Sequence, residues 1–367
     1  MKYLFYGLAL LCITACDSGS EGEANPDDPS DLTMNVLVYD DGSGVVAVSA
    51  TATNATEYQF FMGDADQTVL TDADGNIEFT YAASGNYTIE VRAYGPSGRY
   101  MKDVERIFVP AEEPVSIGEG YTTPITYEDY DLLWNDEFDG GSLDQSIWSY
   151  DNGDGCPSLC GWGNNELQWY RPDNSSFSNG VFTVEANQEP FQGRQYTSTK
   201  VVSRGKQAML YGRADIRAIM PKGQGIWPAI WMLGTNQPSV GWPACGEIDI
   251  MEMIGGSGRE NRVSANMYWE DNGIKNNPRG YTLPEGFLYD KYHVYSIIWT
   301  TESITWLIDD IEYHSQDITS PARTEFHSPF YMIMNVAVGG NWPGAPDDTT
   351  EFPTSMSVDY VRVFQEK

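Results

Sequence analysis

Positive charge, histidine and cysteine are all scarce in this sequence. Its 367 residues include 21 Lys and Arg against 53 Asp and Glu, for a formal net charge of −32, and contain 3 His and 5 Cys. Because so acidic a surface repels phosphates, we expect no nucleic-acid partner. So few nitrogen and sulfur ligands argue against a zinc centre, and we expect no cofactor in the chemistry.

Long apolar runs are also missing, apart from one at the start. Lys2 is followed by an apolar run of about ten residues, whereas a membrane-spanning helix needs roughly 20. We therefore interpret residues 1–16 as a signal sequence. Its last four residues, ITAC, resemble a bacterial lipobox, in which the cysteine, here Cys16, is lipidated. An ordinary signal peptide with an incidental cysteine is the alternative.

The residues after Cys16 predict an exposed tether. Residues 17–31 are rich in Asp, Ser, Pro and Gly, which is typical of a linker. The acidic stretch DSGSEGE at its start resembles a surface-export signal of outer-membrane lipoproteins. We expect a secreted, cell-surface bacterial lipoprotein that is monomeric and meets the membrane only through its lipid anchor.

Three further cysteines allow more than one disulfide. Export permits such bonds. Cys156 and Cys160 would close a small loop, or one of them would pair with Cys245. Either arrangement leaves one thiol.

Strand signals dominate the rest of the chain, and helix signals are sparse. Gly (36) and Pro (20) separate short runs rich in Val, Ile, Tyr and Phe, which predicts an all-β protein. Residues 32–110 hold about seven such runs, which suits a small β-sandwich. Their segments YQFFMGD, FTY and GNYTIEV resemble a polycystic-kidney-disease-type immunoglobulin-like domain, which we interpret as a spacer.

A second linker and a larger β-domain follow. The linker is expected at residues 111–131 and the β-domain at residues 132–367, a size compatible with one sandwich. A hairpin turn is expected at Asp309-Asp310. The clearest strands are expected at Gly180–Ala186, Met209–Met220, Gly246–Ile254, His293–Thr300, Ile304–Ile308 and Met356–Gln365.

The segment GEIDIME, residues 246–252, concentrates the acidic side chains most relevant to chemistry. Because side chains alternate along a strand, Glu247 and Asp249 share one face, and strict alternation would put Met251 beside them. A one-residue β-bulge at Ile250-Met251 would bring Glu252 to the same face instead.

Three acids on one face indicate catalysis of glycoside hydrolysis. Like charges disfavour ionisation, so such a cluster keeps one carboxyl protonated while another stays ionised. A retaining glycosidase needs that combination. We assign Glu247 as nucleophile, Glu252 as general acid/base and Asp249 as the group that tunes them. A calcium site and a solvated acidic strand are the alternatives.

The same strand resembles the bulged active-site motif of glycoside hydrolase family 16, and further segments extend the resemblance over nearly all of residues 133–364. This resemblance implies a concanavalin-like β-jelly-roll sandwich with an open cleft and a retaining mechanism. Within the family the chain is most similar to laminarinases, which are endo-β-1,3-glucanases. Mixed-linkage β-1,3/1,4-glucan is a second possible substrate. The further segments are LWNDEFDG (133–140), GWGNNELQWY (161–170), YGR (211–213), GIWPAIWML (225–233), NVAVGGNWPG (335–344) and VDYVRV (358–363).

The resemblance also implies binding residues. Core packing is the alternative for each Trp, and Trp134 and Trp148 are expected to be structural. A structural calcium ion would use Asp359 with backbone oxygens near Glu137 and Gly180. Expected at the cleft are Trp227, Trp231, Trp342, Trp242, Asn165 and Glu166.

One departure from the family concerns Met267, near which many relatives carry His. This departure bears on the choice of glucan. Two alternative functions stay open: a galactan hydrolase of the agar or carrageenan type, and an inactive glycan-binding lipoprotein.

Overall fold

The computed structural model describes residues 27–39, 44–81, 85–109 and 119–367. The expected signal sequence and Cys16 lie outside these residues. The chain divides into two compact units, Met1–Pro114 and Val115–Lys367, which we treat separately. Along the described residues, no helix combines the length and apolar character that crossing a bilayer requires.

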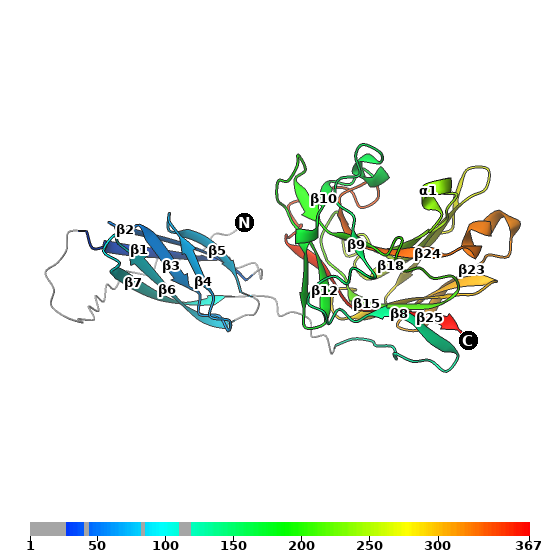
Figure 1. Cartoon of the computed structure of the whole chain (residues 1–367), viewed down its shortest axis with the longest axis horizontal. Coiled ribbons are helices and arrows are strands. Elements are labelled where there is room, and N and C mark those ends of the chain that lie inside the picture. The colour runs from blue at the N-terminus through cyan, green and yellow to red at the C-terminus, as the bar shows by residue number, and fades with distance from the viewer. Residues whose placement is uncertain (1–26, 40–43, 82–84, 110–118) are drawn as a thin grey trace. The chain divides into compact units, whose positions relative to one another are not determined.

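The first unit is a small β-sandwich (Figure 1). It consists of a three-stranded sheet in the order β1-β2-β5 and a four-stranded sheet in the order β4-β3-β6-β7. Its core is formed by alternate residues such as Val46, Val48, Ile89 and Val91, which are at most 2% exposed. The strands are β1 (Ser30–Val38), β2 (Val45–Thr53), β3 (Glu57–Phe61), β4 (Val69–Asp72), β5 (Asn76–Thr80), β6 (Gly85–Tyr94) and β7 (Tyr100–Val109).

The second unit stacks two large antiparallel sheets (Figure 1). We call the sheet β19-β18-β17-β16-β24-β14-β9, with β20 beside β18, the carboxylate sheet. The other, β11-β12-β25-β15-β21-β22-β23 with β8 beside β25, is the outer sheet. This is the expected all-β jelly-roll sandwich.

The strands of the second unit range from two residues in β9 to 13 in β25. The carboxylate sheet contains β9 (Ser149–Tyr150), β14 (Lys200–Val202), β16 (Ile226–Gly234), β17 (Glu247–Glu252), β18 (Arg262–Glu270), β19 (Ile274–Asn276), β20 (Arg279–Thr282) and β24 (Phe330–Val338). The outer sheet contains β8 (Tyr130–Asp136), β11 (Ser175–Ser178), β12 (Val181–Ala186), β15 (Gly212–Ile219), β21 (His293–Trp299), β22 (Ser303–Ile308), β23 (Ile311–Asp317) and β25 (Thr354–Glu366). The remaining described elements are a small parallel pair, β10 (Gln168–Tyr170) and β13 (Tyr196–Ser198), the one-turn helix α1 (Gln237–Val240), and the 3₁₀ helices η1 (Cys160–Gly163), η2 (Pro172–Asn174) and η3 (Pro321–His327).

The core of the second unit lies between these sheets. Trp148, Trp299 and Trp306 are at most 1% exposed, and Trp134 is 8% exposed, so the two tryptophans expected to be structural are buried. Asp309 and Asp310 form the two-residue turn between β22 and β23, with φ of 52° and 59°. Both angles lie in the left-handed region that this hairpin turn requires.

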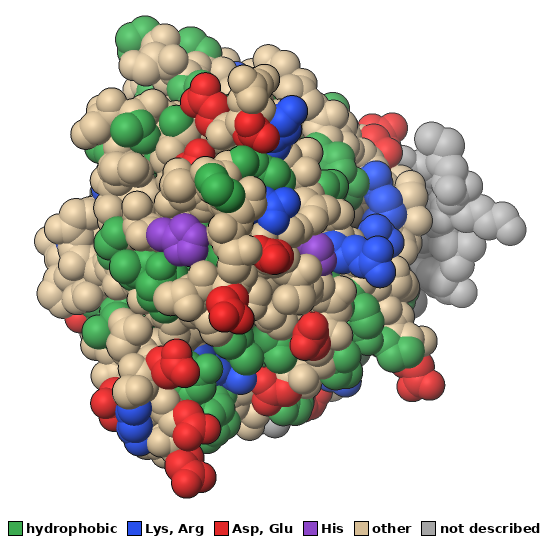
Figure 2. Space-filling view, turned by 90° about the vertical axis from the view of Figure 1, so that its right-hand side faces the viewer, with side chains coloured by type: hydrophobic (Ala, Val, Ile, Leu, Met, Phe, Trp, Pro, Cys, Tyr) green, Lys and Arg blue, Asp and Glu red, His purple; other side chains and the backbone are tan. Residues whose placement is uncertain are grey.

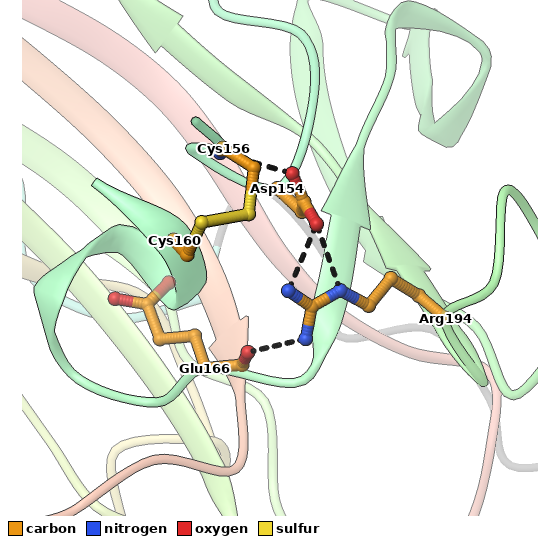
Figure 3. The surroundings of a disulfide bond; sticks show 5 residues. All are labelled: Asp154, Cys156, Cys160, Glu166 and Arg194. Atoms are coloured by element: carbon orange, nitrogen blue, oxygen red, sulfur yellow. Dashed lines mark hydrogen bonds and ion pairs between the residues drawn. A yellow bond between two sulfur atoms is a disulfide. The ribbon is translucent and has the colours of Figure 1, made fainter. Parts of the chain in front are cut away.

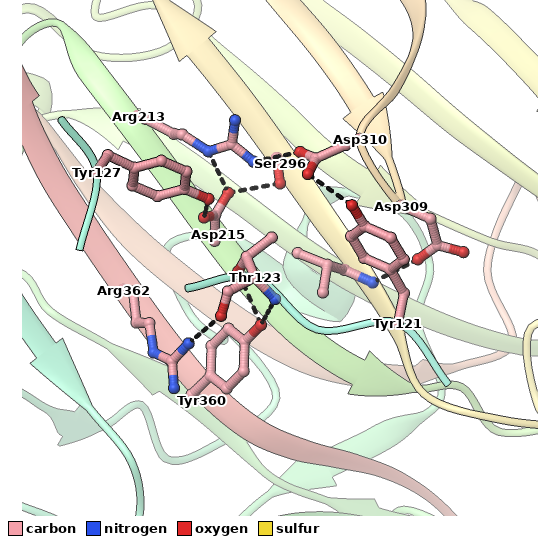
Figure 4. A network of polar contacts seen from close by, with 11 residues as sticks. Tyr121, Thr123, Tyr127, Arg213, Asp215, Ser296, Asp309, Asp310, Tyr360 and Arg362 are labelled. Atoms are coloured by element: carbon pink, nitrogen blue, oxygen red, sulfur yellow. Dashed lines mark hydrogen bonds and ion pairs between the residues drawn. The ribbon is translucent and has the colours of Figure 1, made fainter. Parts of the chain in front are cut away.

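Part of the expected second linker is bound to the outer sheet, and we call residues 119–129 the strap. The buried Arg217 donates to the carbonyl oxygens of Glu119 and Tyr121 at 2.7 and 2.6 Å. Further along, the Thr123 amide donates to the Tyr360 hydroxyl at 2.8 Å, and the Tyr127 hydroxyl donates to Asp215 at 2.7 Å (Figure 4). The strap is therefore bound to the second unit and is not a free tether.

Candidate active site

Strand β17 contains the expected bulge. Opposite it on β16, Trp231 pairs with Asp249 and Ile230 pairs with Met251, so Ile250 is the extra residue. Ile250 and Met251 are 1% and 0% exposed in the core. Because one residue is inserted, both can face the core while Asp249 and Glu252 face the opposite side.

The side of the carboxylate sheet that carries these acids lines a cleft of about 490 Å³. The sheet register explains which side chains meet there. One row across the sheet runs Lys200–Asn335–Ala229–Glu252, from β14 through β24 and β16 to β17. The lining residues are Asp151, Leu159, Trp162, Gly163, Asn164, Glu166, Tyr170, Lys200, Arg204, Trp227, Ala229, Trp231, Leu233, Gln237, Trp242, Glu247, Asp249, Glu252, Tyr268, Tyr331, Ile333, Asn335 and Ala337.

Each glutamate accepts a hydrogen bond from a different indole. Trp242 Nε1 donates to Glu247 Oε2 at 2.9 Å, and Trp227 Nε1 donates to Glu252 Oε1 at 3.0 Å. A third indole, that of Trp231, donates to Asn335 Oδ1 at 2.8 Å. These bonds fix the ring orientations and occupy the indole donors. What the rings offer a ligand is therefore their apolar faces.

The electrostatics of the three acids are strongly coupled. Burial raises the pKa of Glu247, Asp249 and Glu252, and the Glu252 carboxylate raises the pKa of the other two further. A hydrogen bond between Glu247 and Asp249 raises the pKa of Asp249 and lowers that of Glu247. Asp249 Oδ2 is buried, and no N–H or O–H donor of the described residues faces it. Asp249 is therefore placed to keep a proton and to donate it to Glu247.

Lys200, which the sequence does not single out, brings a positive charge to the cleft. Its side chain is 7% exposed, and its ammonium lies 4.0 Å from the Trp162 ring centre and 5.2 Å from that of Trp231. Burial lowers the pKa of this ammonium, and the carboxylates nearby, Glu247 among them, partly oppose that effect. In return, its charge lowers the pKa of Glu247.

A loop closed by a disulfide, drawn in Figure 3, contributes to another wall of the cleft, whose lining includes Leu159. Cys156 and Cys160 are bonded, and Cys245 is a buried free thiol, which selects one of the pairings left open by the sequence. Arg194 clamps the loop by donating to Asp154 Oδ2 at 2.8 and 3.1 Å. Leu159, inside the loop, and Trp162, two residues after it, line the cleft.

Comparison with known proteins identifies the family of this site. The family profile described as "Glycosyl hydrolases family 16" matches residues 164–362, more than half of the chain and all within the second unit. The chain belongs to glycosyl hydrolases family 16. The hydrolase thus has the fold and family that its sequence motifs predict.

Several characterised glucanases are similar to this family 16 hydrolase. "Beta-glucanase" of Rhodothermus marinus is 42% identical over 252 residues, which cover 64% of this chain and 85% of that protein. "Glucan endo-1,3-beta-glucosidase A1" of Niallia circulans is 36% identical over 286 residues, 71% of this chain but 41% of that longer protein. The crystal structure of the laminarinase catalytic domain from Thermotoga maritima is 41% identical, with a TM-score of 0.61, and covers 65% of this chain and 100% of that domain.

Four of the six binding residues expected in the hydrolase line the cleft, namely Trp227, Trp231, Trp242 and Glu166. Trp342 lies next to this wall, packing edge-on against Trp227 with ring centres 5.5 Å apart, and is 43% exposed. Asn165 does not line the cleft and donates instead to Asn341 at 2.8 Å. Glu166 is 6% exposed and accepts from Gln168 at 2.7 Å, so it supports the wall from within.

The residue that faces the cleft beside Glu247 on β18 is Tyr268 rather than Met267. Met267 pairs with Ile248 and is fully buried in the core, whereas Tyr268 pairs with Glu247 and lines the cleft. Burial, with the nearby Asp249, raises the pKa of the Tyr268 phenol to about 12. Met267 therefore does not face the cleft, and the expectation that it bears on substrate choice stays a prediction.

The proposed calcium ligands of the hydrolase are close together but already engaged. A Cβ placed on Gly180 would lie 3.7 Å from the Glu137 carbonyl oxygen. The Glu137 carboxylate is bound by Arg362, and Asp359 Oδ2 accepts from Arg217 at 2.7 Å. Among the described residues, no group of three His, Cys, Asp or Glu side chains is placed to hold a metal ion. A cation here would depend on backbone oxygens and share Asp359 with a guanidinium.

Proposed function

We propose that this hydrolase cuts internal β-1,3 bonds of glucan with retention of anomeric configuration. The bulge in β17, which turns Glu247, Asp249 and Glu252 to one cleft, carries the proposal. Retaining glycosidases use a pair of carboxyl groups flanking the scissile bond. The similarity to a beta-glucanase and a laminarinase supports glucan as the substrate.

The surroundings of the two glutamates support different roles for them. Three groups stabilise a negative charge on Glu247: the Trp242 N–H, the Lys200 ammonium and the Asp249 carboxyl. Only the Trp227 N–H lowers the pKa of Glu252. Burial and the Glu252 charge nevertheless raise the pKa of Glu247 to about 8, above the value of about 7 for Glu252. The groups that stabilise a charge on Glu247, and not the order of these two pKa values, therefore support it as the nucleophile, which must be ionised, with Glu252 as the general acid.

The reaction then runs in two steps, formation and hydrolysis of a glycosyl ester. Glu252 gives its proton to the glycosidic oxygen while Glu247 attacks the anomeric carbon, so the carbon–oxygen bond breaks and a glycosyl ester forms. In the second step the Glu252 carboxylate takes a proton from water. That water attacks the same carbon, and the ester bond to Glu247 breaks. Two inversions give net retention.

Aromatic rings provide the surface on which sugar rings can stack. Trp231 and Trp227 follow each other on the cleft side of β16, and Trp342 extends the surface beyond Trp227. Because the indole donors are taken by protein acceptors, stacking on apolar sugar faces is their remaining contribution.

The test is sugar release from laminarin, lichenan, agarose and carrageenan, with the anomer of the first product followed by NMR. We expect release from laminarin as the β-anomer, and a loss of at least about a hundredfold in Glu252→Gln. On an aryl glucoside with a good leaving group, whose departure needs no proton, Glu252→Gln should retain its first step while Glu247→Gln should not. Near-normal turnover of either variant would refute the roles.

The same panel separates the alternatives. Release from agarose or carrageenan without release from laminarin would indicate a galactan hydrolase. Binding of laminarin with no release from any polysaccharide would indicate an inactive glycan-binding protein.

Three further proposals rest on the sequence alone. Cys16 carries a lipid anchor at the bacterial outer membrane, which metabolic labelling with a fatty acid would show. The hydrolase acts as a monomer, which its elution volume in gel filtration checks. A structural calcium ion stabilises the strands around Gly180 and Asp359 without touching the cleft, and an unchanged melting temperature in chelator would reject it.

A further inference from the structure

Across residues 27–109 of the first unit, positive charge is confined to a single hairpin. Residues 27–109 contain four Lys and Arg against 14 Asp and Glu. All four cations, Arg92, Arg99, Lys102 and Arg106, lie on β6, β7 or the turn between them. The same hairpin contains Glu90, Asp103 and Glu105, so its net charge is 4 − 3 = +1, whereas the rest of residues 27–109 carries 14 − 3 = 11 acids and no cation. The hairpin is therefore the part of this unit that repels an anion least.

The register of this hairpin places three of the cations on the outward face. Arg92 pairs with Lys102, and Thr88 pairs with Arg106, while the intervening Ile89, Val91 and Ile107 point into the core. Arg99 lies in the turn, off this face, and forms an ion pair with Asp28 at 3.0 Å.

Apolar side chains alternate with the cations on this face of β7. The outward residues, in order, are Tyr100, Lys102, Val104, Arg106 and Phe108. Successive outward residues on a strand are about 6.6 Å apart. The two aromatic rings and the valine are 45% to 58% exposed, which is unusual for three neighbouring apolar side chains in a soluble unit.

Strands β3 and β6 add further aromatic and charged side chains to this face. The Arg92 guanidinium lies 4.2 Å from the Phe61 ring centre and 5.0 Å from that of Tyr100. The Tyr94 and Tyr100 rings are 5.1 Å apart. Glu90, bound by Arg92 at 2.6 Å and by Lys102 at 3.7 Å, is a carboxylate already held by the cations of this face.

Protection of an exposed strand edge explains only part of this pattern. β7 ends the order β4-β3-β6-β7, and edge strands often carry charges that prevent pairing with another chain. That function needs no cation on β6, which has a neighbour on both sides, and it does not account for exposed Tyr100 and Phe108. Charges and rings together fit a ligand better than they fit edge protection.

We propose that the outward face of β6 and β7 binds a polyuronate, a polysaccharide whose sugars each carry a carboxylate. Each such sugar offers an apolar ring face and a single negative charge, matching the alternation of Tyr100, Val104 and Phe108 with Lys102 and Arg106. Ring faces stack on aromatic side chains, and carboxylates pair with guanidinium and ammonium groups. The second unit then cleaves its neutral substrate while the first unit adheres to acidic polysaccharide.

The experiment is native gel electrophoresis of the full chain in gels containing polygalacturonate, compared with dextran sulfate, laminarin and no polymer. Flotation with phosphatidylglycerol vesicles forms a separate arm. We expect retardation by polygalacturonate that disappears at high salt, because exposed charge pairs are screened. Lys102→Glu and Phe108→Ser should each weaken binding about two- to fivefold, the range of exposed pairs.

The matched control is Arg99→Glu, which makes the same charge change on the same hairpin but off the face, and should leave retardation unchanged. All variants should keep the melting temperature and laminarin cleavage of the parent. Equal loss in Arg99→Glu would overturn the proposal in favour of unspecific charge attraction. Retardation by dextran sulfate or laminarin alone, flotation with vesicles alone, or no retardation at all would overturn it as well.

Discussion

The two indole–carboxylate bonds at the centre of the cleft predict opposite changes in pH dependence. An N–H that donates to a carboxylate stabilises its ionised form and lowers its pKa. Replacing Trp242 by Phe removes the donor to Glu247, and replacing Trp227 by Phe removes the donor to Glu252. Each change therefore raises the pKa of one glutamate while keeping an aromatic ring in the cleft.

The expected size of each pKa change depends on how exposed the donating indole is to water. A hydrogen bond to a charged group contributes roughly 1.5–3 kcal/mol when shielded from water. Trp242 is 46% exposed, so we expect about 1 kcal/mol there, or about 0.7 pKa unit. Trp227 is less exposed, and we expect a rise of about one pKa unit for Glu252.

The assay is kcat/KM on laminarin between pH 4 and 10, normalised to each variant's own maximum. A nucleophile must be ionised, so Trp242→Phe should move the acid limb to higher pH and narrow the profile. An acid must be protonated, so Trp227→Phe should move the basic limb to higher pH and widen the profile. If Trp242→Phe moved the basic limb and Trp227→Phe the acid limb, the roles of the glutamates would be reversed. If neither variant moved a limb of its pH profile, the electrostatic reasoning would be refuted.

Three other changes test the surroundings of the site. Lys200→Met should also move the acid limb to higher pH, because a positive charge near Glu247 is lost, and Lys200→Arg should restore it. Reduction of the Cys156–Cys160 disulfide should raise KM with little change in kcat, because the loop it closes lines the cleft, and should cost about 2 kcal/mol by loop entropy. Arg217→Met should lower the free energy of urea unfolding by about 3–5 kcal/mol, because it leaves a partly buried carboxylate unpaired. An unchanged pH profile, KM or urea midpoint, respectively, would contradict each expectation.

The face that carries the three acids could be predicted from sequence because its signal is local. Alternation along a strand puts Glu247 and Asp249 together, and a bulge is the simplest way to add Glu252, which β17 adopts. The apolar Ile250 and Met251 provide the reason, since both enter the core.

Features that depend on pairing between distant strands could not be predicted in this way. Lys200 reaches the same row as Glu252 only through β24 and β16, and no local pattern specifies that register. Tyr268 rather than Met267 faces the cleft because of how β18 pairs with β17. The strap could not be predicted because hydrogen bonds to side chains such as Arg217, and not periodic apolar residues, hold it in place.

The strap is the part of the second unit on which a force applied to the preceding chain would act first. Its anchors, among them Arg217 and Tyr360, belong to β15 and β25 of the outer sheet, whose other face packs against the core. A pull on the N-terminal side is therefore resisted by side chains of the layer that does not contain Glu247 and Glu252.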